Sequence, residues 1–127
     1  MRKIFLSILA SFIILLSFNA PILAATYSPQ TIPVLNYNQT NLKITFANVK
    51  KASNISYDLV YEANGMPQGV GGAIQPKGKT IVTKTITIGT CSSGTCVNHK
   101  KLKKMKLMVT FSFPGKTISK TYSIKTK

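Results

Sequence analysis

Apolar residues alternate with polar ones along much of this chain, and the alternation constrains its fold more than any other feature. The longest stripe has an apolar side chain at every second position, namely Met105, Leu107, Val109, Phe111 and Phe113. Side chains two residues apart share one face of a β-strand, so the stripe predicts a strand with one buried face. Similar runs recur between Gly, Pro and Asn residues, and these runs carry no helix signals.

The runs predict an all-β fold, a seven-stranded antiparallel β-sandwich. The expected strands cover residues 32–36, 42–47, 55–63, 68–74, 80–88, 105–113 and 118–124. Tight turns are expected at Asn64-Gly65, at 76–79 and at Pro114-Gly115. The apolar strand faces give the predicted core: Phe46, Tyr57, Leu59, Tyr61, Ile86, Leu107, Val109, Phe111, Tyr122 and Ile124.

The amino-terminal residues have the organisation of a secretory signal peptide. Arg2 and Lys3 precede an apolar stretch over 4–18, and the small residues Ala24 and Ala25 follow it. This order predicts a signal peptide at 1–25, a flexible leader at 26–31 and the sandwich domain at 32–127. The expected location is therefore secreted or cell-surface, with no membrane association after cleavage. The alternative is an uncleaved anchor, which usually needs about 20 continuous apolar residues.

Lysine dominates the charge of the predicted mature chain. Loss of Arg2 and Lys3 leaves fifteen lysines against Asp58 and Glu62, a net charge of +13. Such a charge favours an anionic polymer or another anionic cell-surface partner. Without arginine the bidentate fork that reads guanine is missing, so sequence-specific nucleic-acid recognition is not expected. The alternative is a structural or carrier-like domain whose charge serves only solubility.

The third expected strand, with the sequence Tyr-Asp-Leu-Val-Tyr at 57–61, is similar to the matching strand of fibronectin type III domains. Seven strands ending in a tight hairpin resemble fibronectin type III and immunoglobulin-like sandwiches. The chain has no tryptophan and no tyrosine corner before the sixth strand, where Leu102 and Met105 stand. Its two cysteines are also too close for the inter-sheet bridge of antibody domains. The resemblance is one of architecture.

A second resemblance involves a set of glycines, the two cysteines and the residues that follow them. Its parts are Asn64-Gly65, Gln68-Gly69-Val70-Gly71-Gly72, the Gly-Thr-Cys-Ser-Ser-Gly-Thr-Cys run at 89–96, His99, Met105, Leu107 and Val109. This string resembles exported domains of small-genome, candidate-phylum bacteria. The resemblance implies a secreted bacterial β-sandwich and no particular activity.

Cys91 and Cys96 are the only cysteines, and they are predicted to form a disulfide. A close pair in an exported chain is typical of a structural bridge. Closing so small a loop is expected to contribute only about 2 kcal/mol, enough to stiffen the loop. The alternative is zinc binding by a Cys-x4-Cys-x2-His set that ends at His99, but a structural zinc site needs a fourth ligand. The spacing also differs from the Cys-x-x-Cys of oxidoreductases. Neither a metal nor a cofactor is predicted.

Few residues could carry acid–base chemistry. Asp58 and Glu62 are separated by roughly 13 Å along one strand, which is long for the paired carboxylates of a hydrolase. They are expected to pair with lysines on the solvent face. A catalytic His99 would need a nucleophile and an orienting group, and no carboxylate is near it in sequence. A loop histidine bonded to backbone groups is expected instead. The protein is therefore not expected to be an enzyme.

The densest run of charge follows the cysteines, at 100–106. A hypothesis places Lys100, Lys101, Lys103 and Lys104 with Lys77 and Lys79 in one basic pole that binds the anionic partner, held in place by the disulfide. A solvated strand edge is the alternative interpretation of the run. No aromatic residue is interleaved with these lysines, so the stacking platform of single-strand binders is missing.

Overall fold

Residues 28–127 are described by the computed structural model, and within them the chain forms nine strands and no helix. The strands are β1 (Gln30–Leu35), β2 (Asn41–Ala47), β3 (Asn54–Ala63), β4 (Met66–Ile74), β5 (Ile81–Thr87), β6 (Gly89–Ser92), β7 (Thr95–Asn98), β8 (Leu102–Phe113) and β9 (Lys116–Ile124). The all-β prediction is confirmed. The predicted signal peptide lies outside the described residues.

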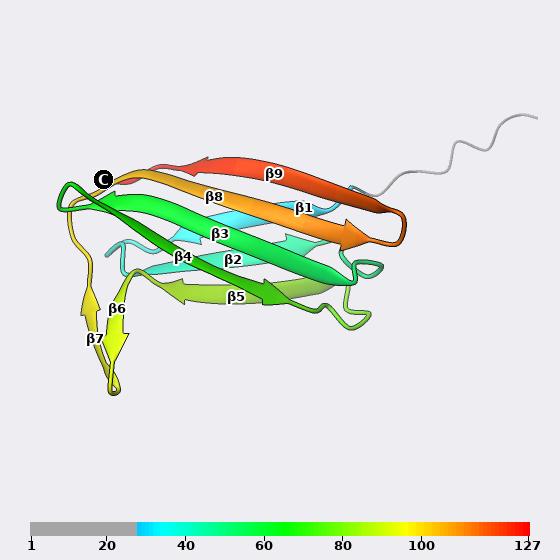
Figure 1. Ribbon diagram of the computed structural model, residues 1–127, viewed down its shortest axis with the longest axis horizontal. Coiled ribbons are helices and arrows are strands. Elements are labelled where there is room, and N and C mark those ends of the chain that lie inside the picture. The colour runs from blue at the N-terminus through cyan, green and yellow to red at the C-terminus, as the bar shows by residue number, and fades with distance from the viewer. Residues whose placement is uncertain (1–27) are drawn as a thin grey trace, which may run out of the picture.

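Seven of the strands form two antiparallel sheets that face each other (Figure 1). One sheet has the order β1-β2-β5 and the other has the order β4-β3-β8-β9. The remaining two strands, β6 and β7, form a hairpin that projects from one end of the molecule. This arrangement is consistent with a β-sandwich carrying an additional hairpin.

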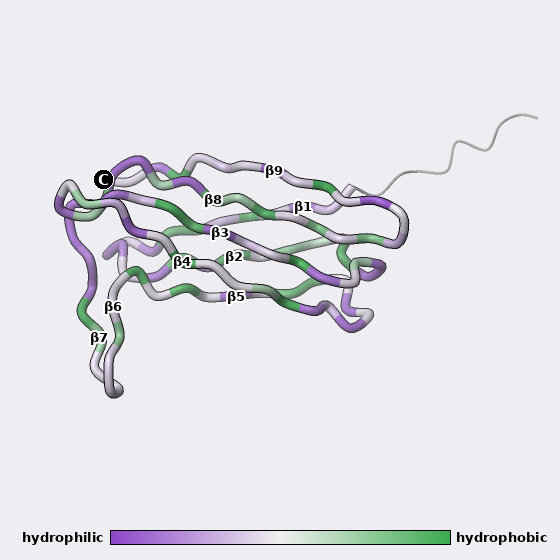
Figure 2. The backbone as a smooth tube through the Cα atoms, in the orientation of Figure 1, coloured by the Kyte–Doolittle hydropathy of each residue, from purple (hydrophilic) through white to green (hydrophobic). Residues whose placement is uncertain are grey.

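The hydrophobic core fills the space between the two sheets. Leu42, Ile44 and Phe46 contribute to it from β2, and every second residue from Ile55 to Ala63 contributes from β3. The Phe46 and Phe111 rings meet edge to face, with centroids 6.1 Å apart, and so connect the two sheets. Figure 2 shows the apolar residues concentrated along the strands.

Eight of the ten predicted core residues are buried. Tyr122 and Ile124 are only partly buried and pack against the core from β9. Their partial exposure follows from topology, because β9 is an edge strand of its sheet. A strand at an edge has a neighbour on one side only, so its inward side chains remain partly open to solvent.

The strand boundaries differ from the expectation by one to three residues, and the differences in β1 and β8 matter most. Gln30 and Thr31, expected in the flexible leader, belong to β1 and pair with Ala47 and Phe46. The prediction of a flexible leader was wrong for these two residues. Both pair with β2, and Thr31 is buried opposite Phe46, a core residue. The strand β8 begins at Leu102, three residues before the expected start.

The turn between β3 and β4 is the one expected from sequence. Asn64 and Gly65 have φ values of 51° and 75°. Two successive residues with positive φ are what a two-residue type I′ hairpin turn requires, and Asn-Gly is its preferred pair. This turn aligns all nine residues of β4 with β3.

Candidate functional site

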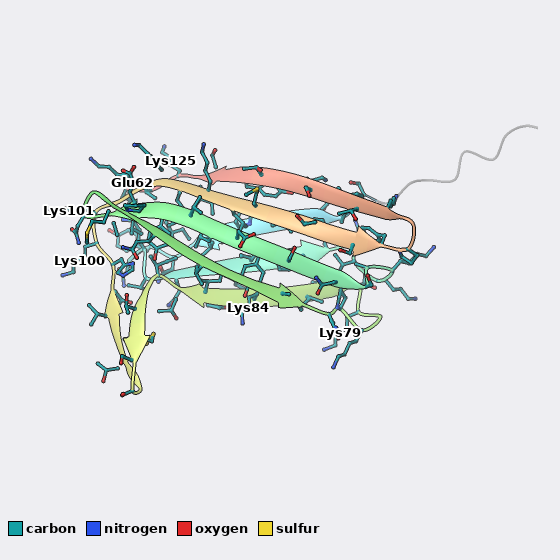
Figure 3. The ribbon with its side chains drawn as sticks, viewed as in Figure 1. Glu62, Lys79, Lys84, Lys100, Lys101 and Lys125 are labelled. Carbon is teal, nitrogen blue, oxygen red and sulfur yellow. A yellow bond between two sulfur atoms is a disulfide. The ribbon has the colours of Figure 1, made fainter. Side chains whose placement is uncertain are left out.

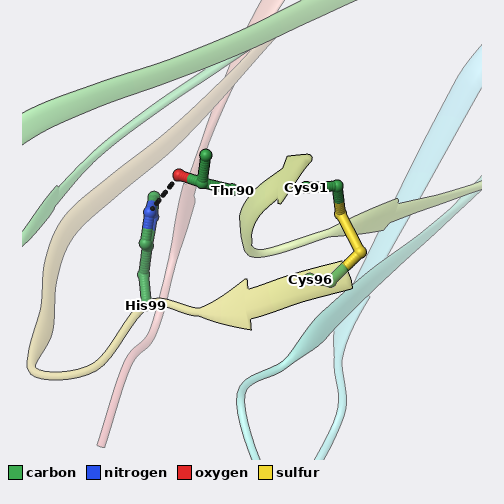
Figure 4. The surroundings of a disulfide bond; sticks show 4 residues. All are labelled: Thr90, Cys91, Cys96 and His99. Carbon is green, nitrogen blue, oxygen red and sulfur yellow. Dashed lines mark hydrogen bonds between the residues drawn. A yellow bond between two sulfur atoms is a disulfide. The ribbon is translucent and has the colours of Figure 1, made fainter. Parts of the chain in front are cut away.

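The cysteine segment forms a projecting hairpin that the sequence did not predict. Cys91 of β6 pairs directly with Cys96 of β7, and the two sulfurs are bonded, which confirms the predicted disulfide (Figure 4). Ser93 and Gly94 make the turn, with φ values of 49° and 81°. Every residue from 90 to 98 is exposed. The hairpin therefore contributes no buried surface to the core.

His99 connects the base of this hairpin to the sandwich. A hydrogen bond of 2.8 Å joins its Nδ1 to the Tyr61 hydroxyl of β3. Another of 3.0 Å joins its Nε2 to the Thr90 hydroxyl of β6, and Figure 4 shows this second bond. Its backbone N–H donates to the Ile88 carbonyl. The expectation of backbone partners was thus incomplete, because both ring nitrogens are bonded to side-chain hydroxyls. Burial also raises the pKa of the Tyr61 hydroxyl, which favours its neutral form.

The cysteine and histidine set does not form a metal site here. Both cysteine sulfurs are used in the disulfide, and both ring nitrogens of His99 have hydroxyl partners. No cluster of three metal-ligating side chains occurs within residues 28–127. The zinc alternative is therefore not supported by this geometry.

Removing the disulfide is expected to loosen the hairpin and leave the sandwich intact. A two-stranded hairpin is at best marginally stable alone, and this one has no core of its own. In a Cys91→Ser, Cys96→Ser variant, amide hydrogen exchange in β6 and β7 should approach that of a free peptide. Exchange in β3 and β8 should be unchanged, since neither strand depends on the bridge. Retained protection in the hairpin would show that the His99 bonds suffice to hold it.

The lysine run lies at the start of β8, where a β-bulge changes the orientation of its side chains. Val60 pairs with Lys106 and Glu62 pairs with Lys103, so Tyr61 opposes two residues, Lys104 and Met105. Lys104 has a φ of 52°, the left-handed conformation that one residue of such a bulge adopts. The extra residue shifts the alternation, which buries Leu102 and exposes Lys103 and Lys104 together.

Lys104 forms the ion pair expected for one of the two acids. Its Nζ donates a 2.9 Å hydrogen bond to Oε1 of Glu62. This hydrogen bond and the carboxylate charge raise the pKa of the Lys104 ammonium. It is the only ion pair in the described part of the chain, so the expectation holds for Glu62 and not for Asp58.

The structure does not gather all six candidate lysines into one pole. Figure 3 places Lys100 and Lys101 at one end of the sandwich and Lys79 at the opposite end. Lys77 lies with Lys79 in the turn after β4, and the whole of β5 separates this turn from the hairpin. The single basic pole was therefore wrong. The segment before β8 does not run back along the sandwich, because the Asn64 N–H binds the Lys100 carbonyl at the near end.

A smaller cluster forms where the lysine run meets the carboxyl-terminal end of β9. The β8–β9 pairing joins Met105 to Ile124 and so brings Lys125 beside the bulge, at the same end as Lys100 and Lys101 (Figure 3). We call this cluster the lysine end and define it by five exposed residues: Lys100, Lys101, Lys103, Lys104 and Lys125. Lys125 was missed in the sequence because only strand pairing brings it to the run.

One aromatic residue also lies near this end. Lys127 donates through Nζ to the Tyr37 carbonyl, and the same Nζ lies 3.2 Å from the centroid of the Tyr37 ring. Tyr37 belongs to the loop between β1 and β2 and is largely exposed. Lys127 covers one face of the ring, so only the other face of Tyr37 is open for stacking by a base.

No family model, curated protein or solved structure matches this chain. Within residues 28–127 there is also no helix long and apolar enough to cross a membrane.

Proposed function

We propose that this protein is an exported, non-catalytic binding module that holds an anionic polymer or another anionic cell-surface partner at its lysine end. The observation that carries the proposal is the concentration of five exposed lysines at one end, where a single acid is available to neutralise them. Glu62 pairs with Lys104, which leaves four lysines for a ligand. Secretion or cell-surface exposure is part of the proposal.

The geometry of the lysine end favours a flexible, repeating polyanion. Its lysines come from the segment before β8, from the bulge and from the residue after β9, so they form a surface and not a pocket. Lysine acts as a point charge on a flexible stem and accepts phosphate or carboxylate groups at many angles. Contacts of this kind give affinity without sequence readout.

The architecture supports the likeness to fibronectin type III domains. Three strands in one sheet, four in the other and a final hairpin formed by β8 and β9 agree with that layout. The hairpin of β6 and β7 is an addition between the fifth and sixth strands of the sandwich. We propose that the sandwich is the scaffold and that its end carries the binding surface.

Polyanion binding is expected to weaken steeply with salt. If four lysines each contact one phosphate, affinity for a single-stranded polyanion should fall about fifty-fold between 50 and 200 mM salt, because each contact releases condensed counterions. Retention on immobilised heparin or polyphosphate, measured across this salt range, tests the expectation. The polymers differ in their acidic group, so comparing them identifies the preferred anion.

The second candidate function is a structural or carrier-like domain with charge serving only solubility. It is favoured by the even distribution of the remaining lysines, which occur at the opposite end as Lys77 and Lys79 and within strands as Lys43 and Lys84. This candidate predicts weak retention that depends on net charge alone. A protein that passes through both columns at 50 mM salt would contradict the binding proposal and favour the carrier.

A further inference from the structure

The edges of the two sheets differ in how they are protected. A strand at the edge of a sheet exposes unpaired N–H and C=O groups that can pair with another chain. Proteins prevent such pairing with proline, with short strands or with a charged side chain that points inward near the edge. The edge strands of the sandwich are β1 and β5 in one sheet and β4 and β9 in the other.

Three of these edges carry a protecting residue near their middle. β1 has Pro33, which lacks an N–H. β5 has Lys84 at the position that pairs with Ile44, a buried residue, so this lysine points toward the core side. β9 has Lys120 opposite the buried Val109, and its Nζ donates to the Pro29 carbonyl at 3.0 Å. Each of these residues interferes with the addition of a further strand.

The β4 edge has no comparable protection. This strand is nine residues long and contains no charged residue, and its one proline, Pro67, is at the second position. The seven residues from Gln68 to Ile74 remain open, a length of roughly 24 Å in an extended strand. On the outer face of β4, Gly69 lies opposite Val60 and Gly71 lies opposite Asp58. These glycines have no side chain, so none projects from β4 at these two positions.

The middle of the β4 edge lies beside one of the two acidic residues of the chain. The chain has only two acidic residues, and both are on β3, the strand next to β4. The Asp58 side chain leans over Gly71, since a Cβ on that glycine would be 2.5 Å from Oδ1 of Asp58. Asp58 therefore places its negative charge on the edge strand itself, in a chain where nearly every other charge is positive.

We propose that β4 is a self-association edge, where two copies of this chain pair in antiparallel orientation about a two-fold axis near Val70. The pairing joins the two four-stranded sheets into one sheet of eight strands. A second copy is the occupant because Asp58, which forms no ion pair within the described residues, reduces the repulsion between two lysine-rich molecules at this edge. The two-fold contact uses the β4 edge of both copies, so no β4 edge is left for a third copy. Because the other edges of the sandwich are protected, the assembly ends at a dimer.

Salt dependence separates this proposal from polyanion binding. Two copies with a charge of the same sign repel each other, and salt screens that repulsion. Sedimentation equilibrium of the mature protein should therefore show a monomer–dimer equilibrium that strengthens between 50 and 500 mM salt. Binding at the lysine end should weaken over the same interval, so either proposal can fail without the other.

A matched pair of variants tests the location of the interface. Gly69→Asp places a carboxylate on the outer face of β4, where a Cβ meets only the Leu59 carbonyl at 3.7 Å, an ordinary contact. In the pairing about Val70, residue 69 lies opposite Gly71 of the second copy, over which the Asp58 side chain of that copy leans. Thr121→Asp changes the net charge by the same amount on the outer face of β9, where Thr121 is exposed. Gly69→Asp should raise the dimer dissociation constant by roughly tenfold or more, because like charges on paired strands repel each other. Thr121→Asp should not raise it by more than about twofold.

Val70→Lys gives β4 the inward lysine that protects β5 and β9, and it should also abolish the dimer. Melting curves of all variants show whether each one is folded. A monomer at every salt concentration would overturn the proposal. So would a dissociation constant that changes equally in Gly69→Asp and Thr121→Asp, since only net charge would then matter.

Discussion

The Leu107→Ala variant is expected to lose about 2 to 5 kcal/mol of its free energy of unfolding. Leu107 is 0% exposed and lies in the middle of β8, between Leu59 on β3 and Tyr122 on β9. Truncation removes its buried methyl groups and leaves a cavity that the sheet on either side can only partly fill. Urea unfolding monitored by tyrosine fluorescence measures the loss.

The neighbouring residue provides the control. Met108 is 51% exposed on the outer face of the same strand, so Met108→Ala should cost under about 0.5 kcal/mol. The difference between these two adjacent sites depends only on which face of β8 is buried. Equal losses at both sites, or a larger loss at Met108, would contradict the assigned register.

Where one face of a strand is buried, the sequence was sufficient to predict the strand and its buried face. The stripe from Met105 to Phe113 has alternating burial in the structure, as does the run from Ile55 to Ala63. In both strands, a shift of the pairing register by one residue would move all the apolar side chains from the core to solvent. The alternating pattern therefore determines which face of the strand is buried. The Asn64-Gly65 turn was predictable for a similar reason, because few residue pairs adopt two positive φ values.

The bulge at Lys104 could not be predicted from alternation. Strict alternation from Met105 would place Lys103 inward and Leu102 outward. The structure avoids burying a lysine by inserting one residue, and Leu102 enters the core instead. The sequence did contain an energetic signal. Strict alternation would expose the apolar Leu102 and bury the charged Lys103, and a β-bulge between them and Met105 avoids both costs.

The hairpin of β6 and β7 was missed for a different reason. Strand prediction depends on an apolar face, and this hairpin buries nothing. Its structure comes from the disulfide, the Ser93-Gly94 turn and the bonds of His99 to Tyr61 and Thr90. The disulfide was predictable from the cysteine spacing together with the predicted export. The partners of His99 were not, because Tyr61 is 38 residues away in the chain.

Replacing Lys100, Lys101 and Lys103 together by Gln is expected to abolish most of the salt-sensitive polyanion binding. Each lysine removed should lower the slope of log affinity against log salt by roughly 0.7, so the triple variant should lose about 2 from the slope. The melting temperature should be nearly unchanged, because all three side chains are exposed. Titration with polyphosphate at several salt concentrations gives both the affinity and the slope.

The matched control removes the same charge from the opposite end of the sandwich. Lys50, Lys77 and Lys79 are exposed, and the Val49 N–H bonds to the Thr80 carbonyl, which holds the two loops that carry them together. If the lysine end is the binding surface, replacing these three by Gln should change the affinity only through long-range charge, which salt screens within about 10 Å at 0.1 M. The difference between the two triple variants should therefore persist as salt rises. Equal losses from both variants at every salt concentration would mean that net charge alone attracts the polymer, and the lysine end would not be a site.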